Sequence, residues 1–274
     1  MSESLGPSVY AIDGVGGSGK SHVIRGLQRL LDEEGRTSVV YKISGLGDSP
    51  RVAQLKMINE CREQMLAADK APEKVRADKR NDRIFRLASA YQTRLFEKER
   101  LTLTQDTIFL DRTPMLHWVY SASADPENPS LKEMHEEGIE LMRRLGVSRT
   151  FLLTVAPSTA FARLIARGVA LEPSVDEQAR KIEELSRMVG APADEHAVIH
   201  EKTFHLLKNV KIEPKALVRW DFIPYRIMQD ECLRYQEAVS DAERILGIPF
   251  TIVDAELPSD EVISTIQKSI HRLY

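Results

Sequence analysis

Cysteine is almost absent from this chain, whose 274 residues include only Cys61 and Cys232. Two thiols so far apart give neither a disulfide framework nor a four-cysteine zinc site, so we interpret them as reduced core residues. No apolar run approaches the roughly 20 residues that a transmembrane helix needs, and the first residues lack the basic and apolar stretches of a signal peptide. We therefore expect a cytoplasmic protein with no membrane partner.

An excess of charge of one sign is also lacking. The 38 Lys and Arg residues stand against 41 Asp and Glu residues, which leaves a formal net charge of -3. This balance supplies no overall attraction to nucleic acid and favours a small-molecule substrate. The hydrophobic content of 42% is ordinary for a globular protein and excludes a disordered or fibrous chain.

Glycine is concentrated in one eight-residue stretch near the N-terminus, which matches the pattern G-x-x-x-x-G-K-S. The backbone of such a loop curls closely around phosphate oxygens and presents N–H donors at the start of a helix. The lysine brings positive charge to the β and γ phosphates, and the serine hydroxyl ligates magnesium. The pattern predicts a site for ATP and Mg²⁺ made of Gly14, Gly16, Gly17, Ser18, Gly19, Lys20 and Ser21; a structural glycine turn is the alternative.

Apolar runs and helical patterns alternate along the chain. Helical spacing follows the glycine loop from Lys20 until Gly35, and short buried-strand runs recur between later helical stretches. This alternation predicts an α/β protein with parallel βαβ units and five strands. The expected strands are 8–13, 37–43, 106–111, 149–156 and 249–254, and further helices are expected at 133–145, at 158–168 with Ser158 as the cap, at 259–273 and within 51–104.

Residues 172–220 interrupt this alternation with acids and bases in close succession. We expect an inserted helical lid within a single domain that spans residues 1–274. Such a mobile element would exclude water from a transferring phosphoryl group. The alternative is a rigid helical addition that packs on the core or at a dimer surface, which the helical spacing of Ile182, Leu185 and Val189 favours.

Two sets of charged residues are candidates for the chemistry: Asp13, Asp111 and Arg112 at the ends of expected strands, and two arginines on one face of an expected helix. Asp111 can hold magnesium or its water as a Walker-B aspartate does, and Asp13 competes for that role or for orienting an attacking hydroxyl. Arg163 and Arg167 are four residues apart, so both can reach phosphate. Phosphoryl transfer needs cations around the migrating group, so the candidate catalytic residues are Lys20, Asp111, Arg112, Arg163 and Arg167. The alternatives are a strand-end cap for Asp111, a surface ion pair for Arg112 and a solvated helix face for Arg163 and Arg167.

Five segments, taken in order, carry a family likeness. They are 11–21 at the glycine loop, 45–50 after the second strand, 109–113 around Asp-Arg, 163–168 with its two arginines, and 249–255 in the last strand. The chain resembles the thymidylate kinase family and, slightly less, the deoxynucleoside kinases. This resemblance implies a three-layer P-loop NTPase fold with a five-stranded parallel sheet. The same resemblance implies magnesium-dependent transfer of the ATP γ-phosphate to a nucleoside or nucleotide, and often a homodimer. It also implies that Arg112 contacts phosphate near the transfer site, and that Arg163 and Arg167 close over the donor.

The acceptor side departs from thymidylate kinases. Gly16 stands where they usually carry an acidic residue, and residues 89–94 are closer to the Gln-bearing helix of deoxynucleoside kinases. Tyr91 and Gln92 can stack on and hydrogen-bond a planar acceptor, although Tyr91 can equally be a core residue. Arg51 is one of the cations nearest to the expected second strand. The candidate acceptor-binding residues are Asp13, Arg51, Tyr91 and Gln92.

These patterns give one leading hypothesis and two rivals. The leading hypothesis is an ATP-dependent phosphotransferase that moves the γ-phosphate to a nucleoside monophosphate, a nucleoside or a similar small acceptor. The first rival is a nucleotide-dependent ATPase switch that acts on a protein partner. The second is a binding module that kept the loop and lost catalysis. A GTPase is disfavoured because the sequence lacks the Asn-Lys-x-Asp guanine signature.

Overall fold

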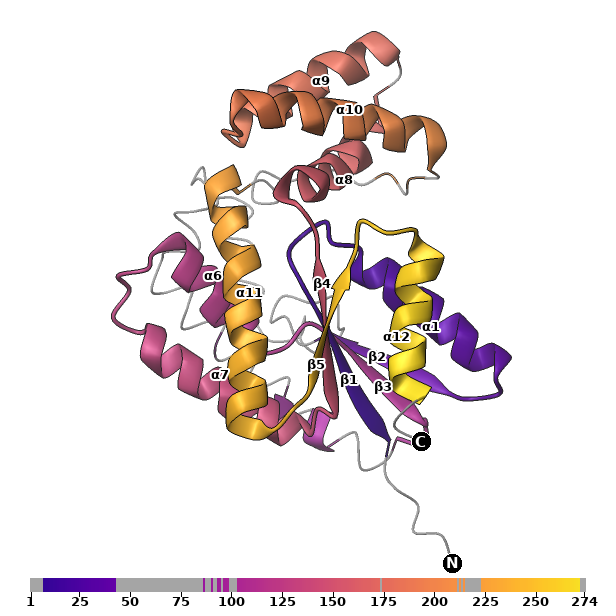
Figure 1. The fold of residues 1–274 in the computed structure, drawn as a ribbon, viewed down its shortest axis with the longest axis vertical. Coiled ribbons are helices and arrows are strands. Elements are labelled where there is room, and N and C mark those ends of the chain that lie inside the picture. The colour runs from indigo at the N-terminus through magenta and orange to yellow at the C-terminus, as the bar shows by residue number, and fades with distance from the viewer. Residues whose placement is uncertain are drawn as a thin grey trace, which may run out of the picture.

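A five-stranded sheet forms the centre of the molecule (Figure 1). The computed structural model describes residues 7–42, 86, 90, 93–94, 96–98, 103–172, 174–210, 212, 214 and 223–271, with the backbone alone for residues 42 and 271. The strands are β1 (Ser8–Asp13), β2 (Ser38–Lys42), β3 (Thr107–Asp111), β4 (Arg149–Thr154) and β5 (Phe250–Asp254). All neighbours are parallel, in the order β2-β3-β1-β4-β5. Because β1 lies between β3 and β4, the loop that follows β1 leaves the middle of the carboxyl edge.

Helices cover both faces of this sheet (Figure 1). On one face, α1 (Lys20–Glu33) packs against α12 (Ser259–His271). On the other face, α6 (Leu116–Ala124), α7 (Leu131–Leu145) and α11 (Tyr225–Leu246) pack together. The predicted α/β class, its three layers and its five-stranded parallel sheet are confirmed.

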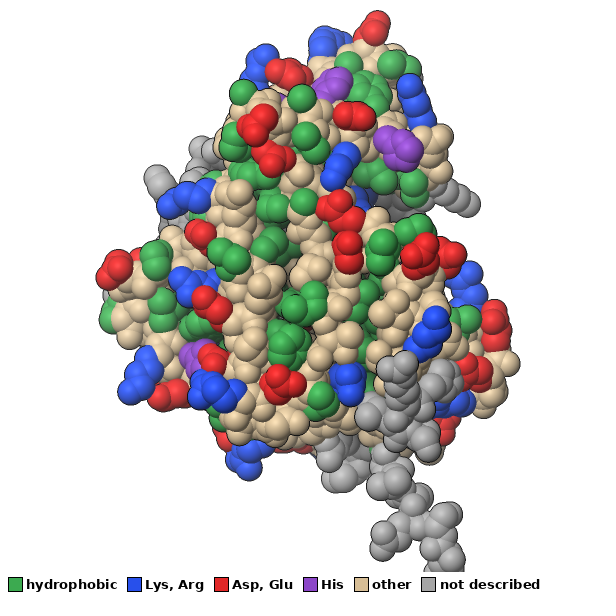
Figure 2. Space-filling view, in the orientation of Figure 1, with side chains coloured by type: hydrophobic (Ala, Val, Ile, Leu, Met, Phe, Trp, Pro, Cys, Tyr) green, Lys and Arg blue, Asp and Glu red, His purple; other side chains and the backbone are tan. Residues whose placement is uncertain are grey.

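The segment expected to form a lid folds largely into two helices, α9 (Val175–Met188) and α10 (Ala193–Asn209). With α8 (Pro157–Val169) they lie beyond the carboxyl edge of the sheet, and acidic and basic side chains are interspersed over this group (Figure 2). α10 packs along α8, and Ile182 and Ile199 are fully buried. The expectation of helices is confirmed for α9 and α10. Their packing favours a rigid addition, and a mobile lid stays a prediction.

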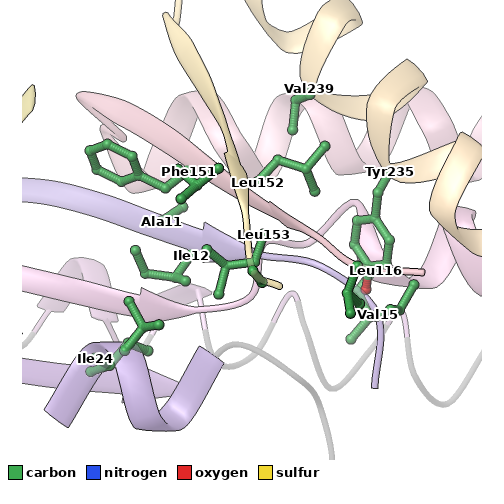
Figure 3. Packing of buried hydrophobic residues seen from close by; sticks show 14 of the residues in the cluster. Ala11, Ile12, Val15, Ile24, Leu116, Phe151, Leu152, Leu153, Tyr235 and Val239 are labelled. Atoms are coloured by element: carbon green, nitrogen blue, oxygen red, sulfur yellow. The ribbon is translucent and has the colours of Figure 1, made fainter. Parts of the chain in front are cut away.

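The core lies where the central strands are held between the two helical layers. Ile12 and Phe151 are fully buried in β1 and β4, with Ile24 of α1 on one side and Val239 of α11 on the other (Figure 3). Burial of each large apolar side chain contributes about 1.5–3 kcal/mol. The ends of the central strands are therefore held firmly, and so are the loops that leave them.

The start of α8 differs from the sequence prediction. β4 ends at Thr154 rather than Ala156, and Ser158 is not the cap, because Ala156 occupies the N-cap position and gives no side-chain hydrogen bond. Pro157 takes the first helical position, where its missing N–H would have no partner inside the helix. The N–H of Ala156 instead donates to Oε1 of Glu256 at 2.9 Å. A carboxylate some 100 residues away thus replaces the expected local cap.

Two helices, α6 and α11, were not predicted. In α6 nearly every residue is apolar or small, so the sequence shows no helical stripe. The region expected to be helical at 51–104 lies mostly outside the described residues, although residue 86 and every described position from 90 to 98 are helical. Within the described part of the chain, every helix is too short or too polar to cross a bilayer.

Candidate active site at the carboxyl edge of the sheet

The glycine loop joins the end of β1 to the start of α1, as the sequence predicts. Gly14 has a φ of 139° and Gly17 a φ of 79°, values that side-chain-bearing residues rarely adopt. A Cβ at Gly14 would lie 2.5 Å from the carbonyl oxygen of Leu153, and one at Gly17 would lie 2.4 Å from that of Ala160. Both conformation and space therefore require glycine. The result is a tight backbone cradle at a helix N-terminus, the geometry that accommodates phosphate.

Lys20 reaches back over this cradle from the first turn of α1. Its Nζ donates to the carbonyl oxygens of Gly14 at 2.9 Å and Val15 at 2.7 Å, and to Oγ of Ser18 at 3.2 Å. Burial, reinforced by the charge of Arg112, holds the pKa of the ammonium well below its usual range. A phosphate bound in the cradle would favour the charged form of Lys20. In that form Lys20 would bring positive charge to the phosphates, as the sequence predicts.

Asp111 ends β3 beside the glycine loop. Its backbone pairs with Ile12 of β1, and its carboxylate is half-buried and close enough to favour the charge of Lys20. Ser21 is exposed at the start of α1. Among the described residues no three acidic, histidine or cysteine side chains group together as a protein-only metal site. One hydroxyl and one carboxylate fit magnesium that arrives with a nucleotide, because Mg²⁺ keeps several waters and takes phosphate oxygens as ligands.

Asp13, the competitor of Asp111, is engaged elsewhere. Its side chain is buried, and its Oδ1 accepts the backbone N–H of Thr113 at 3.1 Å while its Oδ2 accepts the Thr113 hydroxyl at 2.7 Å. Burial raises the pKa of Asp13, and the two bonds from Thr113 partly offset the rise. This geometry favours Asp111 as the metal-side carboxylate, and contact between Asp13 and an acceptor stays a prediction.

Arg112 lies next to these groups and is half-buried. Its NH1 donates to the hydroxyl oxygen of Tyr120 at 2.7 Å and to that of Tyr235 at 2.9 Å. No carboxylate within the described part of the chain pairs with it through a hydrogen bond. The alternative of a surface ion pair therefore does not describe Arg112.

Arg163 and Arg167 share one face of α8, as their spacing predicts, and both line a cavity beside the glycine loop. NH2 of Arg163 donates to the carbonyl oxygen of Ala255 at 2.7 Å, and its NH1 lies 3.4 Å from that of Gly17. Arg163 thereby connects the loop, α8 and the turn before α12. Arg167 adds a second positive charge to the same cavity.

The cavity has a volume of about 510 Å³. Its walls are the glycine loop and the start of α1, the arginine face of α8, the end of α10, and residues 255–259. The loop is thus continuous with a space bounded by four separate parts of the fold. A volume of this order is within the 300–1,000 Å³ typical of small-molecule sites.

Sequence reasoning missed four residues at this edge, and several residues that it named are not among the described ones. Arg51, Tyr91 and Gln92 lie outside the described residues, as do residues 44–50 of the expected substrate loop. Missed were Thr113, Tyr120, Tyr235 and Glu256. Thr113 adjoins Asp-Arg and could have been considered, whereas Tyr235 is 123 residues from Arg112 and no local signal points to it.

The sequence matches no protein-family model and no curated protein at a significant level. Function therefore has to be argued from the loop, the charges around it and the cavity beside it.

Proposed function

We propose that this chain is an ATP-dependent kinase that moves the γ-phosphoryl group of ATP to a nucleoside, a nucleoside monophosphate or a similar small acceptor. The observation that carries the proposal is the meeting of two cationic groups at one sheet edge. Lys20 lies over a glycine cradle, and Arg112 follows the adjacent strand β3. A single phosphate would need only the cradle, whereas transfer needs positive charge on both sides of the migrating group.

The cavity beside the loop supports ATP as the donor. It continues from the phosphate cradle and is large enough for a nucleoside. The face of α8 that carries Arg163 and Arg167 forms one wall, so positive charge lies along the path from cradle to cavity. In this proposal the triphosphate occupies the loop, and the base and sugar occupy the cavity.

The chemistry asked of the protein is mainly positioning. The bond between the γ-phosphorus and the β–γ bridging oxygen breaks, a bond from an acceptor oxygen to that phosphorus forms, and ADP leaves. A hydroxyl acceptor also loses its proton, whereas an ionised phosphate acceptor requires no base. Lys20 and Arg112 offset the developing charge, and Ser21 and Asp111 would hold Mg²⁺, which supplies further charge neutralisation on the phosphates when bound.

An acceptor-dependence assay tests this proposal. ADP release from MgATP is measured with a panel of nucleosides and nucleoside monophosphates, and the phosphorylated product is identified by mass spectrometry. We expect release to depend on one class of acceptor and to be lost in Lys20→Ala. Lys181→Ala, an exposed lysine of α9 that pairs with Glu184, is the matched control.

Two results would count against a kinase. Release of ADP and free phosphate at the same rate with and without every acceptor would favour an ATPase switch acting on a protein partner. Tight binding of MgATP with no turnover under any condition would favour a binding module.

A further inference from the structure

Arg112 is held in a backbone conformation that arginine rarely adopts. Its φ of 77° is the only positive value at a non-glycine position among the described residues. A left-handed conformation of this kind is disfavoured for a residue with a side chain, so it persists only where the surroundings impose it. Strain beside a glycine loop calls for a cause in the neighbouring contacts.

Three hydrogen bonds fix the backbone on either side of the strained position. The N–H of Arg112 donates to the carbonyl oxygen of Ile12 at 3.1 Å, which extends the pairing of β3 with β1. The next residue, Thr113, donates both its N–H and its hydroxyl to the buried carboxylate of Asp13. The chain is thus held before and after Arg112, and the side chain has to leave in one direction.

Two phenols then fix the guanidinium. Tyr120 of α6 and Tyr235 of α11 accept from the same nitrogen, NH1, whose two hydrogens are used by these two bonds. Tyr235 is almost completely buried, so its phenol is held by the packing of the core (Figure 3). Contact between α6 and α11 holds the two phenols relative to each other.

The partners are neutral, and this distinguishes the arrangement from an ion pair. Burial raises the pKa of Tyr235, so its hydroxyl remains protonated at physiological pH. A carboxylate in the same place would cancel the charge of Arg112 and compete with a phosphate for it. Phenols satisfy two N–H groups without forming an ion pair, and the carboxylates of Asp111 and Asp13 act on the charge of Arg112 only through space.

The opposite edge of the guanidinium keeps its donors. Within the described part of the chain, the Nε–H of Arg112 and its NH2 group make no hydrogen bond. These groups form the planar fork that binds two oxygens of one phosphoryl group. Arg112 is half-buried, and neither its Nε nor its NH2 is among the sealed polar atoms that lack a partner in the described residues, so a ligand can reach this edge.

We propose that Tyr120 and Tyr235 are positioning residues, which hold NH1 of Arg112 so that its Nε–NH2 edge meets a phosphoryl group at the carboxyl edge of the sheet. This inference rests on the proposed kinase function, since it assigns how one of its cations is oriented. The Asp13–Thr113 pair completes the arrangement by holding the backbone. Asp13 then acts through Thr113 on the backbone that carries Arg112.

Removal of single hydroxyl oxygens tests the role of the phenols. The test variants are Tyr120→Phe, Tyr235→Phe and the two combined. The control is Tyr225→Phe, which also removes a hydroxyl from α11, but one that hydrogen-bonds Glu195 and Ser158 instead of Arg112. With MgATP and the acceptor that the panel assay identifies, we expect kcat to fall about tenfold for each single variant while KM for ATP stays within about twofold. Tyr225→Phe should leave kcat unchanged. Equal losses in Tyr225→Phe and the two test variants would indicate a general structural effect and overturn the proposal.

A variant cycle shows whether the phenols act through Arg112. Arg112→Met removes the group that they hold, so adding Tyr235→Phe to Arg112→Met should lower kcat no further. If Tyr235→Phe lowers kcat tenfold in both backgrounds, its effect does not pass through Arg112 and the inference is wrong.

Chemical modification gives a readout that needs neither ATP nor an acceptor. Phenylglyoxal modifies accessible guanidinium groups. The rate of modification of Arg112 is followed by peptide mass spectrometry with and without inorganic phosphate. We expect phosphate to slow modification of Arg112 at least fivefold in the wild type and in Tyr225→Phe, and by less than twofold in the double variant. Equal protection in the double variant and in Tyr225→Phe would overturn the positioning role, whatever the chain catalyses. Loss of protection in the double variant of a chain that phosphorylates no acceptor would leave the positioning role intact and reject the kinase.

Discussion

The carboxyl edge of the sheet and the helical pair α9–α10 hold their charged side chains in opposite ways. At the edge, Lys20 donates to backbone carbonyls and Arg112 to two phenols. On the helical pair, charged side chains pair with one another along exposed helix surface. Lys181 lies 2.9 Å from Glu184, and Arg187 lies 2.8 Å from Glu183.

The charged side chains of the helical pair are therefore already paired with one another, whereas Lys20 and Arg112 at the sheet edge can still bind an anion. Exposed pairs of neighbouring residues contribute about 0–1 kcal/mol and ask for no further partner. At the edge, burial disfavours the charge of Lys20, and the hydrogen-bond partners of Arg112 are neutral phenols that form no ion pair with it. A bound phosphate would stabilise both, so substitutions at the edge should change activity and those on the helical pair should change local stability.

Lys20→Ala should have the largest effect on this contrast. We expect kcat to fall about 10²–10³-fold or more, because the variant loses a cation at the transferring phosphates. The thermal midpoint should not fall, since the buried ammonium is disfavoured by its own desolvation. Turnover is measured by ADP release, and folding by circular dichroism.

The control for Lys20 is the paired lysine of the other region. Lys181→Ala removes a charge of the same kind from α9 and should leave turnover unchanged. Near-normal turnover in folded Lys20→Ala would remove the reason for treating the edge as catalytic.

His117 makes the edge sensitive to acid. It is buried in α6, and burial together with the charge of Arg112 lowers its pKa to about 4. The unfolded chain binds this proton near the ordinary pKa of about 6.5 and the folded chain near 4, so stability rises with pH across that window, by about 3 kcal/mol in all. His117→Asn should flatten the pH dependence of the free energy of unfolding between about pH 4.5 and 6.5, as measured by urea denaturation.

The wild-type chain, measured over the same pH range, provides the comparison. The same slope in His117→Asn and the wild type would show that His117 does not report on burial at the edge.

The two regions also differ in how far the sequence predicts them. The glycine loop was predicted with its bounds. Gly14 and Gly17 have positive φ and no space for a Cβ, so the loop conformation requires glycine and leaves a recognisable pattern in the sequence. Arg163 and Arg167 were correctly placed on one face, because helical spacing determines which side chains are neighbours. Chemical motifs and periodicity are local, so a single sequence reveals them.

Contacts between distant segments could not be predicted in this way. Tyr235 meets Arg112 only because α11 packs beside α6, and Glu256 binds the start of α8 only because β5 lies beside β4. The sequence also gave the wrong cap for α8, because Pro157 already begins that helix. The α9–α10 pair was predicted as helical. Periodicity shows which face of each helix is apolar, but it does not show that these faces pack against α8.

Asp111→Asn should have a smaller effect at the edge than Lys20→Ala. We expect about 10- to 100-fold lower activity with a higher requirement for Mg²⁺, by analogy with groups that orient metal ligands. The carboxylate is half-buried, so the free energy of unfolding should change little. Activity is titrated with MgCl₂ and compared with urea unfolding; lower stability with normal specific activity would favour the strand-end cap over the metal role.

Lys202→Met should have the smallest effect and bears directly on the helical pair. Nζ of Lys202 in α10 bonds the hydroxyl of Thr159 and lies 3.4 Å from Oε2 of Glu256, which joins α10 to the turn beside the cavity. The pair is partly exposed, so its loss should cost less than about 1 kcal/mol of unfolding free energy. Hydrogen exchange should nonetheless speed up in α10, while Lys208→Met, an exposed lysine on the same helix, should leave exchange unchanged.

The same exchange measurement decides between a lid and a rigid addition. If α9 and α10 close over a bound donor, MgATP and acceptor together should increase protection across residues 163–210, and Lys202→Met should reduce that increase by loosening the join at Glu256. A rigid addition would already be protected by buried residues such as Ile182 and Ile199. Protection that is high without ligands and unchanged with both of them would reject the lid, and the helical pair would then serve as a fixed wall of the cavity that His205 and Leu206 line.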